Sequence, residues 1–243
     1  MPTVLRIRGF VHNGRVQVEF IVLDDSDAAT RAAGELLAEA ARSGGHIALS
    51  GGSAPENAYR TAAELQPDWS GAELWWGDER CVPPDDERSN YALAKRTLLD
   101  RLQVQPRAVH RARGEADPET AAREYDVALE GVRLQLNFLG VGPDGHAASL
   151  FPNAPGLTEH ERRAIAAEPA LDPKVMRITM TPPMLRNADT VLFLVIGEAK
   201  AEAVAMAFGG APSQGTPASL IRSDGGRTIA VLDRDAAALL EHA

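Results

Sequence analysis

The chain has 243 residues, 44% of them hydrophobic, which suffices for one large α/β domain or two small ones with a packed core. Its formal net charge of −9 argues against nonspecific binding to nucleic acid, which needs a basic surface, but not against a small phosphorylated ligand. Because the N-terminus lacks a secretory pattern, no apolar run approaches the ~20 residues of a membrane span, and Cys81 is the single cysteine, we expect a cytoplasmic protein without a disulfide or a metal.

Apolar segments alternate with segments of helical periodicity along the chain. A hairpin turning at Asn13-Gly14 is expected near the start. Strands are predicted at residues 16–23, 46–50, 72–76, 134–141, 190–197 and 228–232. Helices are predicted at residues 27–42, 56–65, 90–102, 119–133, 199–208 and 235–242. This alternation predicts an α/β fold with a mainly parallel central sheet covered by helices on both faces, and we interpret residues 1–243 as a single domain.

In such a fold, ligands bind outside the carboxyl ends of the strands, and "LSGGSAPENAY" (residues 49–59) is the first loop there. Gly51 and Gly52 let the backbone approach a ligand, Ser53 adds a hydroxyl, and Pro55 opens a helix whose free N–H groups can bind an anion. The loop lacks the G-K-[ST] ending of a nucleoside-triphosphate site. It is either a phosphate cradle or a plain strand-to-helix turn with Ser53 as the cap.

The second loop, "WWGDERCVPPDDERSNY" (residues 75–91), follows an aromatic strand end. Asp78, Glu79 and Arg80 are either solvated there or directed at a polar ligand. The charge run at residues 85–88 is predicted to be a solvated face. Cys81 has no nearby histidine in the sequence, so packing is its expected role rather than nucleophilic catalysis.

The third loop, "LGVGPDGHAASLFP" (residues 139–152), contains a G-x-G-x-x-G match followed by His146. A dinucleotide site also needs an acidic residue at the end of a second strand ~20 residues on, and residues 151–173 are interrupted by prolines and show no strand pattern. His146 is predicted at the start of a helix "HAASLF", where the helix dipole favours a neutral imidazole that can act as a general base. Asp144 lies two residues before it. The alternative is a capping or buried structural histidine, which is the role expected for the other five: His12, His46, His110, His160 and His242.

The fourth region supplies cations. Lys200 is predicted in the first turn of a helix, against the helix dipole, which suggests an anion bound between the ammonium and the N–H groups. The alternative is an exposed lysine offset by Glu198. Arg177, in "MRITMTPPML", is ambiguous from its spacing.

Taken together, these loops resemble the 6-phosphogluconolactonase family within the glucosamine-6-phosphate deaminase/6-phosphogluconolactonase superfamily. The matching segments are "SGGSAPENAY", "WWGDERCVPPDDERSNY", "LGVGPDGHAASLFP", "RITMTPPMLRNA" and "LVIGEAKAEAV". The resemblance implies a Rossmann-like fold and a hydrolase of carbohydrate metabolism. Its reaction would convert 6-phospho-D-glucono-1,5-lactone to 6-phospho-D-gluconate, the second step of the oxidative pentose phosphate pathway, without metal, nucleotide or other cofactor.

The resemblance also assigns roles residue by residue. It implies that His146 is the general base, Asp144 the acid beside it, and Arg80 an active-site arginine. The residues that would bind substrate or its phosphate are Gly51, Gly52, Ser53, Asp78, Glu79, Arg177 and Lys200. The family commonly has threonine after the histidine, where this chain has Ala147, and we expect this departure to tune activity.

Two other functions remain as alternatives. Aminosugar-phosphate deaminases or isomerases of the same superfamily tend to carry tyrosine after the Asp-Glu pair, where this chain has Arg80. A non-catalytic sugar-phosphate sensor would need a basic DNA-binding module, for which the chain has neither spare length nor charge. The expected partner is a phosphorylated sugar lactone, with no nucleic acid and no membrane, and the expected state is a monomer or small homo-oligomer.

Overall fold

A large, mainly parallel β-sheet forms the centre of the fold in the computed structural model, which describes residues 5–8, 11–12, 15–16 and 18–240. Within these residues its strand order is β1-β4-β13-β12-β9-β5-β6-β8. All neighbours pair in parallel except β1, which is antiparallel to β4 at one edge. The strands are β1 (Leu5–Arg8), β4 (Glu19–Leu23), β5 (Gly45–Leu49), β6 (Ala72–Trp76), β8 (Ala108–Val109), β9 (Leu134–Leu139), β12 (Ala188–Val195) and β13 (Arg227–Asp233).

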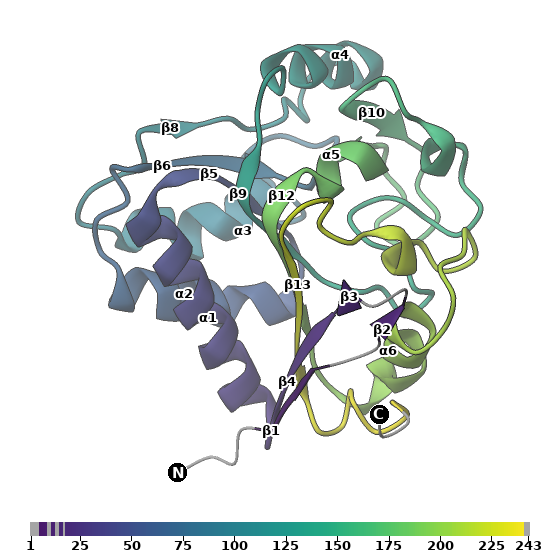
Figure 1. The fold of residues 1–243 in the computed structure, drawn as a ribbon. Helices are drawn as coiled ribbons and strands as arrows, with labels where there is room; N and C mark the ends of the chain where they lie inside the picture. Colours follow the sequence, from purple (N-terminus) through teal and green to yellow (C-terminus); the bar gives the residue numbers. More distant parts are fainter. Residues whose placement is uncertain (1–4, 9–10, 13–14, 17, 241–243) are drawn as a thin grey trace.

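Helices cover both faces of this sheet (Figure 1). One layer consists of α1 (Ser26–Ser43), α2 (Ser53–Leu65) and α3 (Asn90–Thr97). The opposite face carries α5 (Pro182–Arg186) and α6 (Ala201–Phe208), with α4 (Pro118–Ala128) beside them. Side chains alternate along each strand, so Leu192 packs into the core under α1 and α2 while Phe193 packs into the core under α6. The predicted three-layer, Rossmann-like α/β fold is therefore confirmed.

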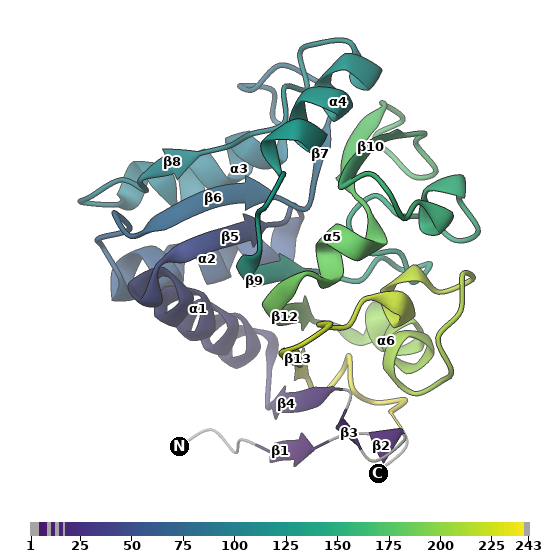
Figure 2. The ribbon, with the colours of Figure 1, turned by 45° about the horizontal axis from the view of Figure 1, so that its top comes forward.

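A second, antiparallel sheet lies beside the large one and consists of β10 (Ala164–Ala167), β11 (Arg177–Met180) and β7 (Asp78–Arg80). Helix α4 packs on β10 and β11, as Figure 2 shows for the β10 side. The prediction that residues 151–173 contain no strand is therefore wrong. Because β11 and β7 pair with Arg177 opposite Arg80, this sheet brings two guanidinium groups from distant parts of the chain to one place.

The predicted elements match the observed ones with a few corrections. Residues 90–102 divide into α3 and the short helix η1 (Leu99–Arg101), and residues 198–208 divide into η3 (Glu198–Lys200) and α6. The helix predicted at residues 119–133 ends at Ala128. Residues 234–239 form turns rather than the predicted helix, whose last residues lie outside the described part of the chain. Two further short helices are η2 (Pro155–Thr158) and η4 (Pro217–Leu220).

The N-terminal hairpin is partly described. Strands β2 (Val11–His12) and β3 (Arg15–Val16) pair antiparallel, while the turn residues Asn13 and Gly14 lie outside the described residues. None of the helices in the described ranges is long and apolar enough to cross a membrane.

Candidate active site

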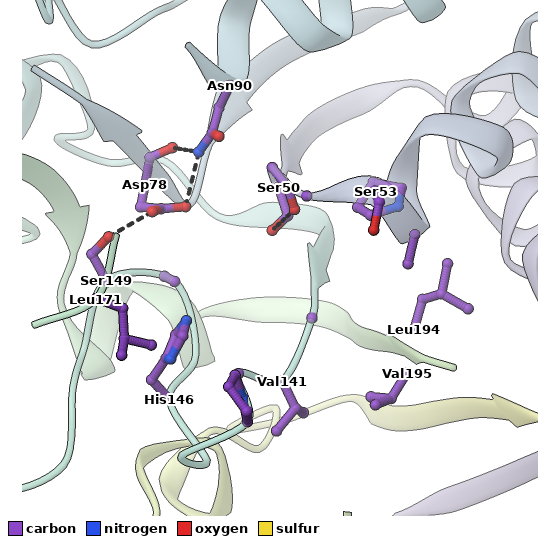
Figure 3. Close-up of a pocket in the computed structure, with 18 of the residues that line it drawn as sticks. Ser50, Ser53, Asp78, Asn90, Val141, His146, Ser149, Leu171, Leu194 and Val195 are labelled. Carbon is purple, nitrogen blue, oxygen red and sulfur yellow. Dashed lines mark hydrogen bonds between the residues drawn. The ribbon is translucent and has the colours of Figure 1, made fainter. Parts of the chain in front are cut away.

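A cavity of about 360 Å³ opens at the carboxyl ends of the parallel strands, where the loops after β5, β6, β9 and β12 meet (Figure 3). It is the place that the sequence predicts for a ligand. Eight of the predicted site residues line it: Gly51, Gly52, Ser53, Asp78, Arg80, His146, Arg177 and Lys200. Asp144 and Glu79 do not line the cavity. Asp144 contacts His146, and Glu79 accepts hydrogen bonds from the start of α3.

His146 is held by a carboxylate two residues before it. Its Nδ1 lies 2.6 Å from Oδ1 of Asp144, and its backbone N–H donates to the same oxygen at 3.1 Å. Because a carboxylate can only accept, Nδ1 carries the proton and Nε2 of a neutral ring presents its lone pair. The ring also packs against Phe151, with 4.9 Å between centroids. Asp144 thus orients a ring that is equipped to take a proton.

No helix begins at His146, so that prediction is wrong. Residues 147–150 form a tight turn closed by a bridge between Ala147 and Leu150, with Ala148 at φ 51°. That left-handed conformation cannot continue a right-handed helix. No helix dipole therefore acts on the ring here, and the Asp144 carboxylate is the group that orients it.

The glycines of this loop make room for the imidazole. A Cβ placed on Gly142 would lie 1.9 Å from Nδ1 of His146, and Gly145 has φ 82°. The Gly142 N–H donates to the His146 carbonyl at 2.9 Å, which closes the loop. A dinucleotide site would also need a second parallel strand that ends in an acidic residue. The strand that follows this loop is β10, and Glu168 comes directly after it, but β10 belongs to the small antiparallel sheet. The second parallel strand of a dinucleotide site is therefore missing at this position.

Asp78 is fixed by two residues that the sequence analysis did not select as ligands. Ser149 Oγ donates to Oδ2 of Asp78 at 2.6 Å, and Asn90 Nδ2 donates to its Oδ1 at 3.2 Å and to its carbonyl at 2.8 Å. Figure 3 shows these three side chains together above His146. Both Asn90 and Ser149 line the cavity. Neither carries a sequence signal of its own, because they reach Asp78 only through the packing of α3 and the His146 loop.

The side chain of Glu79 is directed into the protein. Its side chain is 3% exposed and accepts hydrogen bonds from Ser89 Oγ and from the backbone N–H groups of Arg80, Asn90 and Tyr91. It thereby satisfies N–H groups at the start of α3. The predicted contact with substrate has no support in this geometry, since all its hydrogen-bonding capacity is directed into the protein.

The start of α2 has the geometry of an anion cradle. Gly52, at φ 107°, is the N-cap and supplies no side-chain hydrogen bond, so Ser53 is the first helical residue rather than the cap. Ser53 and Ala54 line the cavity, so this helix start brings N–H groups that no cap side chain satisfies to its wall, together with the Ser53 hydroxyl. A Cβ on Gly51 would lie 1.8 Å from Oδ1 of Asn90, which explains the glycine there.

Three cations line the cavity, and none of them forms a salt bridge within the described residues: Arg80, Arg177 and Lys200. Arg177 is 3% exposed, and its Nε and Nη1 have no hydrogen-bond partner, while Nη2 donates to the Pro173 carbonyl at 2.9 Å. Burial, and then the charge of Arg80, lower the pKa of Arg177. Burial likewise lowers the pKa of Lys200. Cations that line a cavity without forming a salt bridge fit an anionic ligand.

The residues expected to be structural lie elsewhere. Burial raises the pKa of Cys81 to about 11, so its thiol stays protonated. His46 and His110 pack around Trp75, and His160 is exposed. The side chains of His12 and His242 lie outside the described residues. Ala147 is fully buried in the core and does not line the cavity. In the described ranges, no group of three or more histidine, cysteine or acidic residues has the geometry of a metal site.

Comparison with known proteins matches the chain to one family. The model of glucosamine-6-phosphate isomerases/6-phosphogluconolactonase matches residues 24–230. A 6-phosphogluconolactonase of Mycobacterium tuberculosis is 37% identical over 242 residues, covering 90% of this chain and 97% of its own. One of Streptomyces coelicolor is 38% identical, covering 84% and 85%. The crystal structure of the devB protein is 30% identical with a TM-score of 0.81, covering 92% of this chain and all of its own.

Proposed function

The chain belongs to the glucosamine-6-phosphate isomerase/6-phosphogluconolactonase family, and from this premise we propose that it hydrolyses 6-phospho-D-glucono-1,5-lactone to 6-phospho-D-gluconate. It is a hydrolase of carbohydrate metabolism that acts on a sugar-phosphate lactone. The observation that carries the proposal is the pairing of a carboxylate-oriented histidine with three unpaired cations around one cavity. In such a cavity the histidine can take a proton from water, and the cations can bind a phosphate.

The reaction needs no covalent nucleophile, because the carbonyl of a lactone is already reactive. Nε2 of His146 takes a proton from water, and the resulting hydroxide attacks C1 of the lactone. Asp144 accepts the Nδ1–H hydrogen bond and stabilises the imidazolium that forms. The tetrahedral intermediate then expels the ring oxygen, which receives the proton from His146 and becomes the C5 hydroxyl of the acid.

The cations divide between the two ends of the substrate. We assign Arg177, Lys200 and the start of α2, with Ser53, to the phosphate, because all of them line the cavity and carry N–H donors. Arg80 stabilises the charge that develops on oxygen or orients the substrate. Asp78, held by Ser149 and Asn90, accepts a hydrogen bond from a sugar hydroxyl. Binding of the remote phosphate positions the ring for attack at C1.

The experiment that tests this function is a lactonase assay with freshly prepared substrate and the spontaneous rate subtracted. We expect the wild type to hydrolyse the lactone, and His146→Ala to lose turnover by about 10²–10⁴-fold while it still binds the substrate. Near-wild-type kcat in that variant would remove His146 as the base. Release of ammonia from glucosamine 6-phosphate would favour the deaminase alternative instead, and tight binding of the phosphosugar without hydrolysis would favour a sensor.

The remaining expectations are part of the same proposal. The enzyme acts in the cytoplasm as a monomer or small homo-oligomer, uses no cofactor or metal, and binds its phosphorylated substrate without a nucleic-acid partner.

A further inference from the structure

One peptide group lies between Lys200 and the histidine base. The carbonyl of Val141 accepts a hydrogen bond from Nζ of Lys200 at 2.8 Å. The N–H of the same peptide group, which belongs to Gly142, donates to the carbonyl of His146 at 2.9 Å. Lys200 is thus connected to the backbone of His146 by two hydrogen bonds and one planar peptide.

The same peptide also borders the imidazole ring. The space where a Cβ of Gly142 would stand is filled by the ring, with Nδ1 at 1.9 Å and Cε1 at 2.1 Å from that point. The Cα of Gly142 is therefore in close contact with the side chain that Asp144 orients. A rotation of this peptide would move its Cα against the ring and would weaken the bond to the His146 carbonyl.

We propose that Lys200 is a positioning residue for His146 as well as a ligand of the phosphate. The inference rests on the proposed function and deepens it. An ammonium group has three N–H donors, so one can hold Val141 while the other two meet the phosphate. Lys200 is half-buried, where a charged donor makes a stronger hydrogen bond and polarises the peptide that it contacts. Phosphate binding at Lys200 is in this way coupled to the position of the base.

The proposal differs from the role expected from the sequence, in which Lys200 acts on the phosphate alone. Arg177 provides the contrast, because its hydrogen bonds go to the carbonyls of Leu171 and Pro173 and not to the His146 loop. A phosphate ligand matters only for a phosphorylated substrate. A positioning residue matters for every substrate that needs the base.

The test therefore compares 6-phospho-D-glucono-1,5-lactone with unphosphorylated glucono-1,5-lactone in Lys200→Met, which keeps the length of the side chain. We expect kcat on the phosphorylated lactone and kcat/KM on the unphosphorylated one to fall by about 10-fold or more, since a misplacement of about 1 Å can cost about 100-fold. Lys200→Arg, which keeps a cationic donor, should restore a substantial part of the loss on both lactones. Lys95→Met, at an exposed lysine paired with Asp100, is the matched control and should behave as wild type.

A second readout needs no substrate. Nitrogen-15 resonances of the His146 ring report its tautomer and its hydrogen bond to Asp144, and we expect Lys200→Met to shift them in the free enzyme. Wild-type hydrolysis of the unphosphorylated lactone by this variant overturns the proposal. If that lactone is too slow a substrate for the wild type, unchanged His146 resonances overturn it. Failure of the wild type on the phosphorylated lactone would refute the proposed function and leave the resonance test intact.

Discussion

Gly142→Ala is expected to displace the imidazole ring of His146 through a direct steric clash. The added methyl group would lie 1.9 Å from Nδ1 and 2.1 Å from Cε1 of His146, about 1.5 Å inside ordinary van der Waals contact. Gly142 is not among the glycines with positive φ, so alanine meets no backbone strain and the clash with the imidazole is the whole effect. The ring rather than the backbone must shift, because the peptide groups on both sides of Gly142 are held by hydrogen bonds, and a shift of the ring disturbs the 2.6 Å contact between Nδ1 and Asp144.

The magnitude follows from that displacement. A shift of about 1 Å in a catalytic group costs about 100-fold, so we expect kcat of Gly142→Ala to fall by about 100-fold, or about 2.7 kcal/mol of transition-state stabilisation. KM should change little, since the cations that bind the phosphate are untouched. Steady-state kinetics on the phosphorylated lactone measures both constants. Gly140→Ala is the control in the same loop, because its Cβ would meet only the Leu194 carbonyl at 3.9 Å. Equal kcat values for the two variants would refute the steric argument.

Two further substitutions separate catalysis from stability. Asp144→Asn removes the charge that accepts the 2.6 Å bond from Nδ1, so kcat should fall by about 10–100-fold, the value of a hydrogen bond to a charged group; a change in KM alone would contradict this role. Glu79→Gln places an amide donor among groups that are all donors, and leaving one of them unpaired should lower the free energy of unfolding by about 1–3 kcal/mol in urea denaturation. KM of the folded Glu79→Gln enzyme should change by less than about threefold, whereas unchanged stability with a large rise in KM would return Glu79 to the substrate site.

Much of the fold could be predicted from local patterns. The continuous apolar runs predicted the parallel strands other than β8 to within a few residues, because a strand buried on both faces tolerates few polar side chains. The exceptions are short or irregular elements. β10 has only four residues among prolines, and residues 234–239 form turns despite helical spacing, because local preference is overridden where tertiary contacts decide the backbone.

The residue types of the site were also readable in the sequence, since glycines, a histidine and charged residues at strand ends have a limited set of uses. The sequence alone predicted that Asp144, His146, Arg80 and Lys200 follow the carboxyl ends of parallel strands. It did not determine which way the side chains turn. Asp78 and Glu79 are neighbours, yet one faces the cavity and the other caps α3, because successive strand residues point to opposite sides.

The tertiary structure alone decided the contacts between segments that are distant along the chain. Arg177 lies opposite Arg80 because of the register of β11 against β7, and Lys200 reaches Val141 because β12 and β9 are neighbours in the sheet. Register and strand order are set by how buried faces fit together across the whole fold, and no local spacing encodes them. The sequence therefore singled out His146 and its loop, and the packing of the sheets decided which cations and which peptide group surround this histidine.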